Sequence, residues 1–209
     1  AVTIAGAFCS LLRNDTTHMP SAVVQAVISE LSGPAMVTAG WTLLGMNFMP
    51  MGPTAGMVGA CEPQKTWGNR TFLNMMEHAP LFLSSLWVFA IFVSAEEATK
   101  IGTTYIALRS LYPVIWAAYG GANGAPMQPY TWFLFGKGMN LFYVTFPQYG
   151  CVFYMALATL LKLGLAIDLN SIVGVPALAA PLGFGLFLYH FALGGFPYLQ
   201  KAVAPLFGK

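Results

Sequence analysis

One stretch of the chain, residues 70–87, reads RTFLNMMEHAPLFLSSLW and decides how the rest is organised. Arg70, Asn74 and Glu77 lie at positions i, i+4 and i+7, which places all three on one face of a helix. The residues around them are largely apolar. A polar side chain left unpaired in such a setting costs roughly 2–7 kcal/mol, and a charged one costs more. We therefore expect these three side chains to face one another, a ligand or water, and not lipid.

The composition of the whole chain predicts a membrane protein. Of its 209 residues, 57% are hydrophobic and only 8% are charged, whereas soluble domains carry about a quarter charged residues. Several uncharged stretches exceed the roughly 20 residues that cross a bilayer. The net charge of +2 is small and dispersed, which excludes a nucleic-acid-binding surface. The three cysteines show no spacing typical of a metal site.

We expect one all-α transmembrane domain over residues 1–209, made of apolar helices separated by loops rich in glycine and proline. The predicted spans are residues 21–48, 70–94, 101–119, 141–165 and 173–196. Glycines and prolines crowd residues 49–68, which predicts a loop, and the polar residues 95–100 predict a turn that makes the second and third spans antiparallel. The last run is diluted by two prolines and several glycines. It could be a span, a kinked span or a helix pair, and we favour a span.

A second stripe follows the predicted turn, with Arg109, Tyr112 and Trp116 at i, i+3 and i+7. At about 1.5 Å per residue, Glu77 lies roughly 27 Å from the turn, Trp116 roughly 24 Å and Arg109 roughly 13 Å. The two stripes are therefore predicted to overlap near Glu77 and Trp116, with Arg109 reaching toward that level.

Two interpretations of these stripes remain open. A guanidinium can hold a carboxylate ligand by paired hydrogen bonds, Glu77 can hold a ligand amine, and Tyr112 could donate to a developing thiolate or oxyanion. Alternatively, Glu77 pairs with Arg70 or Arg109 and only locks two helices together.

The motifs resemble a known family. The matching features are Arg70-x-x-x-Asn74-x-x-Glu77, then PLFLxxLWV over residues 80–88, then Arg109-x-x-Tyr112. Over residues 67–119 the chain is similar to the membrane-associated proteins of eicosanoid and glutathione metabolism (MAPEG), in particular glutathione-conjugating leukotriene synthases and microsomal glutathione transferases. The first and fourth predicted spans match only as apolar helices.

The resemblance implies a four-helix membrane bundle, usually a homotrimer, with glutathione bound between subunits. It implies that Arg70, Asn74 and Glu77 hold glutathione, that Arg109 and Tyr112 complete the site, and that Trp116 stands where the family has a tyrosine. The predicted fifth span would be an addition to this bundle.

The chain departs from the family in its basic residues. Active leukotriene-type members carry a further arginine between the third and fourth spans, where it stabilises the thiolate, but residues 117–136 contain no Lys or Arg. Residues 42–59 also lack the basic residues that the family has at the end of the first helix. A thiol with a pKa near 8.5 needs positive charge or donors to ionise at neutral pH. Whether the chain is an enzyme is therefore left open.

Two functions follow from these features. The first is a glutathione transferase or peroxidase acting on a lipophilic electrophile. The second is a non-catalytic subunit of a larger membrane assembly, such as a photosynthetic or respiratory supercomplex, in which the former site is degenerate and lipid or pigment fills the grooves. Partners would be membrane lipids together with two further copies, or other membrane subunits. The chain starts at Ala1, which would fit removal of an organellar targeting sequence; an endomembrane, a thylakoid membrane and a mitochondrial inner membrane all remain open.

Two histidines, His78 and His190, lie in apolar surroundings and are candidate ligands of a metal or a pigment magnesium. A membrane histidine is more often hydrogen-bonded within its bundle, and we expect that role here. Gln148, which follows a proline, is a weaker candidate still.

Overall fold

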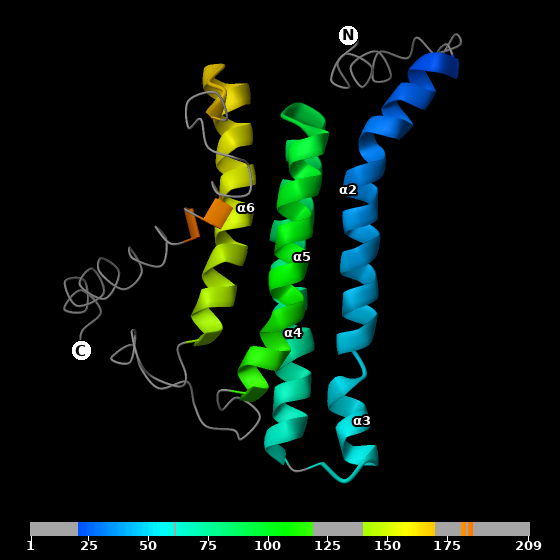
Figure 1. Cartoon of the computed structure of the whole chain (residues 1–209), viewed down its shortest axis with the longest axis vertical. Coiled ribbons are helices and arrows are strands. Elements are labelled where there is room, and N and C mark those ends of the chain that lie inside the picture. The colour runs from blue at the N-terminus through cyan, green and yellow to red at the C-terminus, as the bar shows by residue number, and fades with distance from the viewer. Residues whose placement is uncertain (1–20, 61, 119–139, 170–180, 183, 186–209) are drawn as a thin grey trace, which may run out of the picture.

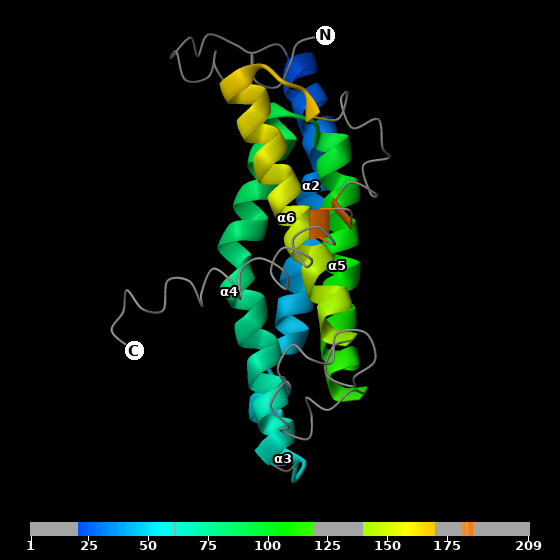
Figure 2. The same cartoon turned by 90° about the vertical axis from the view of Figure 1, so that its left-hand side faces the viewer.

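The computed structural model describes residues 21–60, 62–118, 140–169, 181–182 and 184–185. Four long helices lie side by side and alternate in direction (Figures 1 and 2): α2 (Ser21–Phe48), α4 (Glu62–Phe92), α5 (Ala95–Ala118) and α6 (Asn140–Leu165). A short helix, α3 (Met51–Met57), packs beside the first turns of α4. The described residues contain no strand. The all-α prediction is therefore confirmed for this part of the chain.

Three segments within the described residues are long and apolar enough to cross a membrane: Ala22–Ala55, Gln64–Phe92 and Val144–Leu165. This agrees with an integral membrane protein. Helix α5 is not among them, because Arg109 and the threonine, serine and tyrosine residues of this helix lower the mean hydropathy of α5. It nevertheless packs against α2, α4 and α6 and runs the length of the bundle (Figure 1).

Each of the four long helices carries one proline inside it: Pro34, Pro80, Pro113 and Pro147. A proline removes one backbone donor and leaves the carbonyl four residues earlier without its helical partner. Helix packing in the bundle therefore tolerates these losses at every helix.

The predicted loop over residues 49–68 was wrong, because it contains α3 and the first turns of α4. Gly68, taken as a breaker, lies inside α4 where that helix meets α3. A Cβ at Gly68 would lie 2.6 Å from the backbone carbon of Met51. This glycine is explained by close approach of two helices rather than by a turn.

The predicted turn over residues 95–100 was also wrong, because these residues form the first turns of α5. The Ser94 hydroxyl accepts a hydrogen bond from the Glu97 backbone N–H at 3.2 Å, so Ser94 caps the helix. Glu96 and Glu97 lie at the helix N-terminus, where negative charge is favoured. The connection between α4 and α5 is therefore only Val93 and Ser94.

The predicted span over residues 21–48 matches α2, and that over residues 141–165 differs from α6 by one residue. The predicted span 70–94 begins eight residues too late, since α4 starts at Glu62. Most of the predicted fifth span, residues 173–196, lies outside the described residues. The parts of it that are described pack on α6: a Cβ at Gly150 of α6 would collide with Pro181 and Gly185, and Phe184 contacts the ring of Tyr154.

Buried side chains divide the bundle into two halves. Toward the connection between α4 and α5 the core is apolar, with Phe82, Leu86 and Phe89 of α4 packed against Ile101 of α5 and Met155 of α6. Toward α3 the buried side chains include a polar group, Thr71, His78, Arg109 and Gln148, beside apolar ones such as Phe48 and Met75. All of the predicted site residues that the structure describes lie in or beside this polar half.

Candidate functional site

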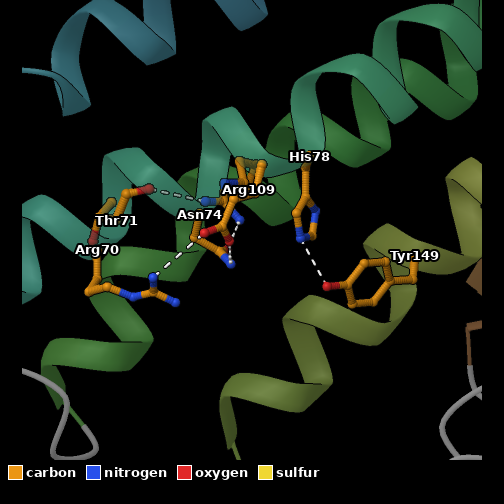
Figure 3. Close-up of polar contacts among 7 residues, drawn as sticks. Arg70, Thr71, Asn74, His78, Arg109 and Tyr149 are labelled. Atoms are coloured by element: carbon orange, nitrogen blue, oxygen red, sulfur yellow. Dashed lines mark hydrogen bonds and ion pairs between the residues drawn. The ribbon is translucent and has the colours of Figure 1, made fainter.

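The guanidinium of Arg109 is the centre of the polar half. Its side chain is 0% exposed. One terminal nitrogen donates to Asn74 Oδ1 at 2.7 Å and reaches Gln148 Oε1 at 3.5 Å. The other donates to the Thr71 carbonyl at 3.1 Å (Figure 3). Helices α4, α5 and α6 therefore each contribute to holding one buried positive charge.

The position at which α5 begins explains why Arg109 lies close enough to Asn74 for a hydrogen bond. Because α5 starts at Ala95, Arg109 lies about 21 Å along it, and Asn74 lies about 27 Å back from the end of α4. The extended arginine side chain covers the difference. The sequence-based estimate placed Arg109 too close to the connection between the helices. It did so because residues 95–100 were assigned to a turn, whereas they belong to α5.

Arg70 and Glu77 form an ion pair on the outside of α4, at 3.6 Å. Their side chains are 51% and 55% exposed. Asn74 joins this pair to the buried charge, because its Nδ2 donates to Glu77 Oε2 at 3.4 Å while its Oδ1 accepts from Arg109. All three residues of the predicted stripe thus lie in one network.

Tyr112 contacts the Arg109 guanidinium with the face of its ring. The Arg109 carbon Cζ is 4.4 Å from the centre of the Tyr112 ring, which is a cation–π contact. Trp116 meets the same ring edge-on, with centroids 5.6 Å apart. Trp67 of α4 donates to the Pro113 carbonyl at 3.1 Å and so fixes the end of α5 against α4. These aromatic rings form one wall of the polar half.

His78 belongs to a second layer, one turn along α4 from Asn74. Its Nε2 is 3.0 Å from the Tyr149 hydroxyl of α6 (Figure 3) and its Nδ1 is 3.4 Å from the Tyr105 hydroxyl of α5. The side chain is 6% exposed. Both ring nitrogens are engaged within the bundle, which agrees with the expected hydrogen-bonded role. His190, the other candidate pigment ligand, lies outside the described residues.

Two donors of the buried cluster have no partner among the described residues: Arg109 Nε and Gln148 Nε2. In addition, no described carboxylate lies within ion-pair distance of the Arg109 guanidinium, since its nearest partners are neutral oxygens. A buried charge without a counterion is costly. The cluster is therefore electrostatically suited to an anionic group, such as a carboxylate or a thiolate.

Sequence reasoning missed several members of the site. Gln148 is only a weak candidate on sequence grounds, and the sequence pattern does not single out Thr71, Tyr105 or Tyr149. The available signal was the pair Gln148–Tyr149 in the otherwise apolar α6, but its partners depend on how α6 packs, which the sequence does not state. Within the described residues, no group of three or more His, Cys, Asp or Glu side chains could hold a metal ion.

Comparisons with known proteins add no relative to this description. No protein-family model, curated protein or solved structure matches the chain.

Proposed function

We propose that this chain is a membrane-embedded glutathione-dependent enzyme of the MAPEG type. Its thiol substrate would add to, or reduce, a lipophilic electrophile that arrives from the bilayer. The observation that carries the proposal is the buried Arg109 guanidinium, which is held by neutral oxygens of α4 and, at 3.5 Å, of α6, and has no described carboxylate in contact. A purely structural ion-pair network would be expected to place a carboxylate there.

The surrounding residues fit a zwitterionic peptide with two carboxylates and one amine. Arg70 can hold a ligand carboxylate by paired hydrogen bonds. Glu77 can accept from an ammonium group, and Asn74 can both donate and accept. The Arg70–Glu77 contact at 3.6 Å is half-exposed, so it is worth little on its own. Exchanging it for ligand contacts therefore costs little.

Positive charge at this site would also favour ionisation of a bound thiol. A thiolate is the nucleophile, and nearby cationic groups raise its fraction at neutral pH. Arg109 supplies such a charge without a carboxylate that would neutralise it. Tyr112, whose ring faces the guanidinium, would limit water access on one side and strengthen the electrostatic effect.

Binding of glutathione to the purified protein tests the proposal. We expect wild-type protein in detergent to bind glutathione, and Arg70→Ala to weaken binding about 10- to 100-fold, since a charged hydrogen bond is worth about 1.5–3 kcal/mol. Lys65→Ala is the matched control. Lys65 lies on the same helix in an ion pair with Glu62 at 2.6 Å and should leave binding unchanged. Absence of binding by the wild type, or equal effects of the two substitutions, would refute the proposal.

A second candidate function rests on a different observation. Pro181 and Gly185 pack on α6 through their close backbone approach to Gly150, and this contact lies outside the four-helix bundle. Such an added element suits a non-catalytic subunit recruited into a larger membrane assembly. Mild solubilisation from the native membrane followed by sizing distinguishes the two. Co-migration with a large complex without glutathione binding would favour the subunit, and a small homo-oligomer that binds glutathione would favour the enzyme.

A further inference from the structure

Three side chains from three helices form a hydrogen-bonded row: Tyr105 of α5, His78 of α4 and Tyr149 of α6. Tyr105 is 0% exposed, and its ring stacks on Phe82 with centroids 3.8 Å apart and planes 8° from parallel. Tyr149 is 38% exposed. The row therefore runs from the closed core of the bundle to a partly exposed tyrosine on α6.

The buried end of the row decides the direction of its hydrogen bonds. His78 Nδ1 is the partner that the structure gives to the Tyr105 hydroxyl. A buried phenol that kept its hydrogen unshared would cost about 1–3 kcal/mol. Tyr105 therefore donates to Nδ1, and Nδ1 is an acceptor.

The state of the imidazole follows from this. A neutral imidazole carries its hydrogen on one nitrogen only, so an accepting Nδ1 places the hydrogen on Nε2. Nε2–H then donates to the Tyr149 oxygen. The Tyr149 hydroxyl hydrogen is consequently not used within the row and is available to a group outside it.

We propose that the Tyr149 hydroxyl donates a hydrogen bond to the sulfur of the bound thiol substrate and so stabilises the thiolate. The proposal rests on the glutathione-dependent function above. The thiol proton leaves to water, the sulfur keeps the electron pair, and Tyr149 stays protonated throughout. Tyr149 is then the group that touches the reacting atom. His78 and Tyr105 are positioning residues, because they act only by fixing the direction of its hydroxyl.

The position of Tyr149 next to the candidate site supports this assignment. Its neighbour Gln148 reaches Arg109, and its partner His78 follows Glu77 on α4. The charged groups that act on Tyr149 are Arg109 of α5 and Glu77 of α4. Arg109 favours a thiolate and Glu77 opposes it. Neither is altered in the variants below, so their contributions cancel in the comparison.

Titration of the bound thiol provides the first test. The thiolate absorbance of glutathione on the protein is followed against pH, and the Kd of S-methylglutathione, which has no ionisable thiol, serves as the binding control. We expect Tyr149→Phe to lower the thiolate-to-thiol ratio at neutral pH about tenfold, equivalent to about one pKa unit, with the Kd of the control ligand unchanged. An unchanged titration would overturn the proposal.

Two buried variants separate positioning from packing. Tyr105→Phe keeps the ring but removes the donor to Nδ1, so Nε2 can become the acceptor and draw the Tyr149 hydrogen away from the substrate. We expect it to lower the thiolate fraction as Tyr149→Phe does, although Tyr105 touches no ligand. His78→Gln offers one donor and one acceptor and should retain part of the wild-type titration, whereas His78→Leu should not. If Tyr105→Phe titrates as the wild type, the row does not orient Tyr149.

The tautomer of His78 can be measured without any substrate. Nitrogen-15 NMR of histidine-labelled protein in lipid nanodiscs, with His78→Gln used to identify the signal, reports which nitrogen carries the hydrogen. We expect Nε2–H. Observation of Nδ1–H overturns the proposal whether or not glutathione binds. Observation of Nε2–H in a protein that does not bind glutathione refutes the proposed function, and the sulfur assignment falls with it while the orientation of Tyr149 stands.

Discussion

Two amide side chains contact the same Arg109 nitrogen, and their replacement by leucine should change the free energy of unfolding by very different amounts. Asn74 Oδ1 lies 2.7 Å from that nitrogen and Gln148 Oε1 lies 3.5 Å away. The first distance is a short charge-assisted hydrogen bond, and the second is at the limit of a hydrogen bond. Leucine is close to both amides in size. The comparison therefore isolates the polar contribution of each.

Asn74→Leu should destabilise the bundle by about 3 kcal/mol. A hydrogen bond to a charged group is worth about 1.5–3 kcal/mol, and the guanidinium N–H left behind is buried and unsatisfied. The Asn74 contact with Glu77 is lost as well, but Glu77 is half-exposed and water can replace that contact.

Gln148→Leu should change the free energy of unfolding by no more than about 1 kcal/mol in either direction. The weak contact with Arg109 is lost, but the buried Nε2, which has no described partner, disappears with it. Removing an unsatisfied buried donor recovers about 1–3 kcal/mol. The same substitution should weaken glutathione binding if that donor serves the ligand, so binding would fall while stability stays nearly constant.

Reversible unfolding of the ligand-free protein in mixed micelles measures both variants under the same conditions. A difference of about 2–4 kcal/mol between them is expected, with Asn74→Leu the less stable. Equal losses, or a larger loss for Gln148→Leu, would refute the argument that bond length and burial rank these two partners of Arg109.

Three further predictions concern regions outside the polar cluster. Gly150→Val should release Pro181 and Gly185 from α6, because its side chain would occupy their backbone; faster proteolysis next to these two residues with intact helices is the expected result, and unchanged proteolysis would contradict it. Gly68→Ala should cost about 1–3 kcal/mol through its collision with α3, and an unfolding midpoint equal to that of the wild type would show that α3 can move aside. The hydrogen bond from Lys100 holds the pKa of Glu96 below its usual value. The contribution of this pair to folding stability is therefore complete above the ordinary glutamate pKa of about 4.3 and is lost as pH falls through the lower pKa of the folded state. Lys100→Met should remove that part of the acid dependence of stability, and identical acid unfolding profiles of the variant and the wild type would refute the pairing.

The positions of the long helices could be predicted from the sequence because apolar composition extends over whole spans. The common face of Arg70, Asn74 and Glu77 was also predictable, since helical spacing depends on local sequence alone. The level of Arg109 was not predicted correctly. The tetrapeptide Ser94-Ala-Glu-Glu97 has the Ser-x-x-Glu pattern of a capping box, and reading it as a turn shifted α5 by six residues. The signal for the start of α5 was therefore present in the sequence, but the polar residues that carry it were interpreted as a turn between helices.

The roles of Gln148 and Tyr149 could not be derived in the same way. Their partners Arg109 and His78 are 39 and 71 residues away in the respective pairs. Which face of α6 meets α4 and α5 depends on the packing of three helices, and this is set by many side chains together. Long-range pairing of single polar residues is therefore the part of the site that needs a structure.

The two-residue connection between α4 and α5 has a consequence for how the chain enters a membrane. An arginine near the middle of a lone helix adds about 2.5–3.5 kcal/mol to the free energy of insertion, and α5 is the long helix of the described residues that has no stretch apolar enough to count as a membrane span. Arg109 pairs with the Asn74 side chain and the Thr71 carbonyl, and both of these lie on α4, which has already been synthesised when α5 emerges. Insertion of α4 and α5 as one hairpin lets the arginine enter with its hydrogen bonds made. We therefore expect biogenesis of this protein to depend on a polar contact as well as on hydrophobicity, so that separating the two helices with a long polar linker would leave α5 outside the bilayer.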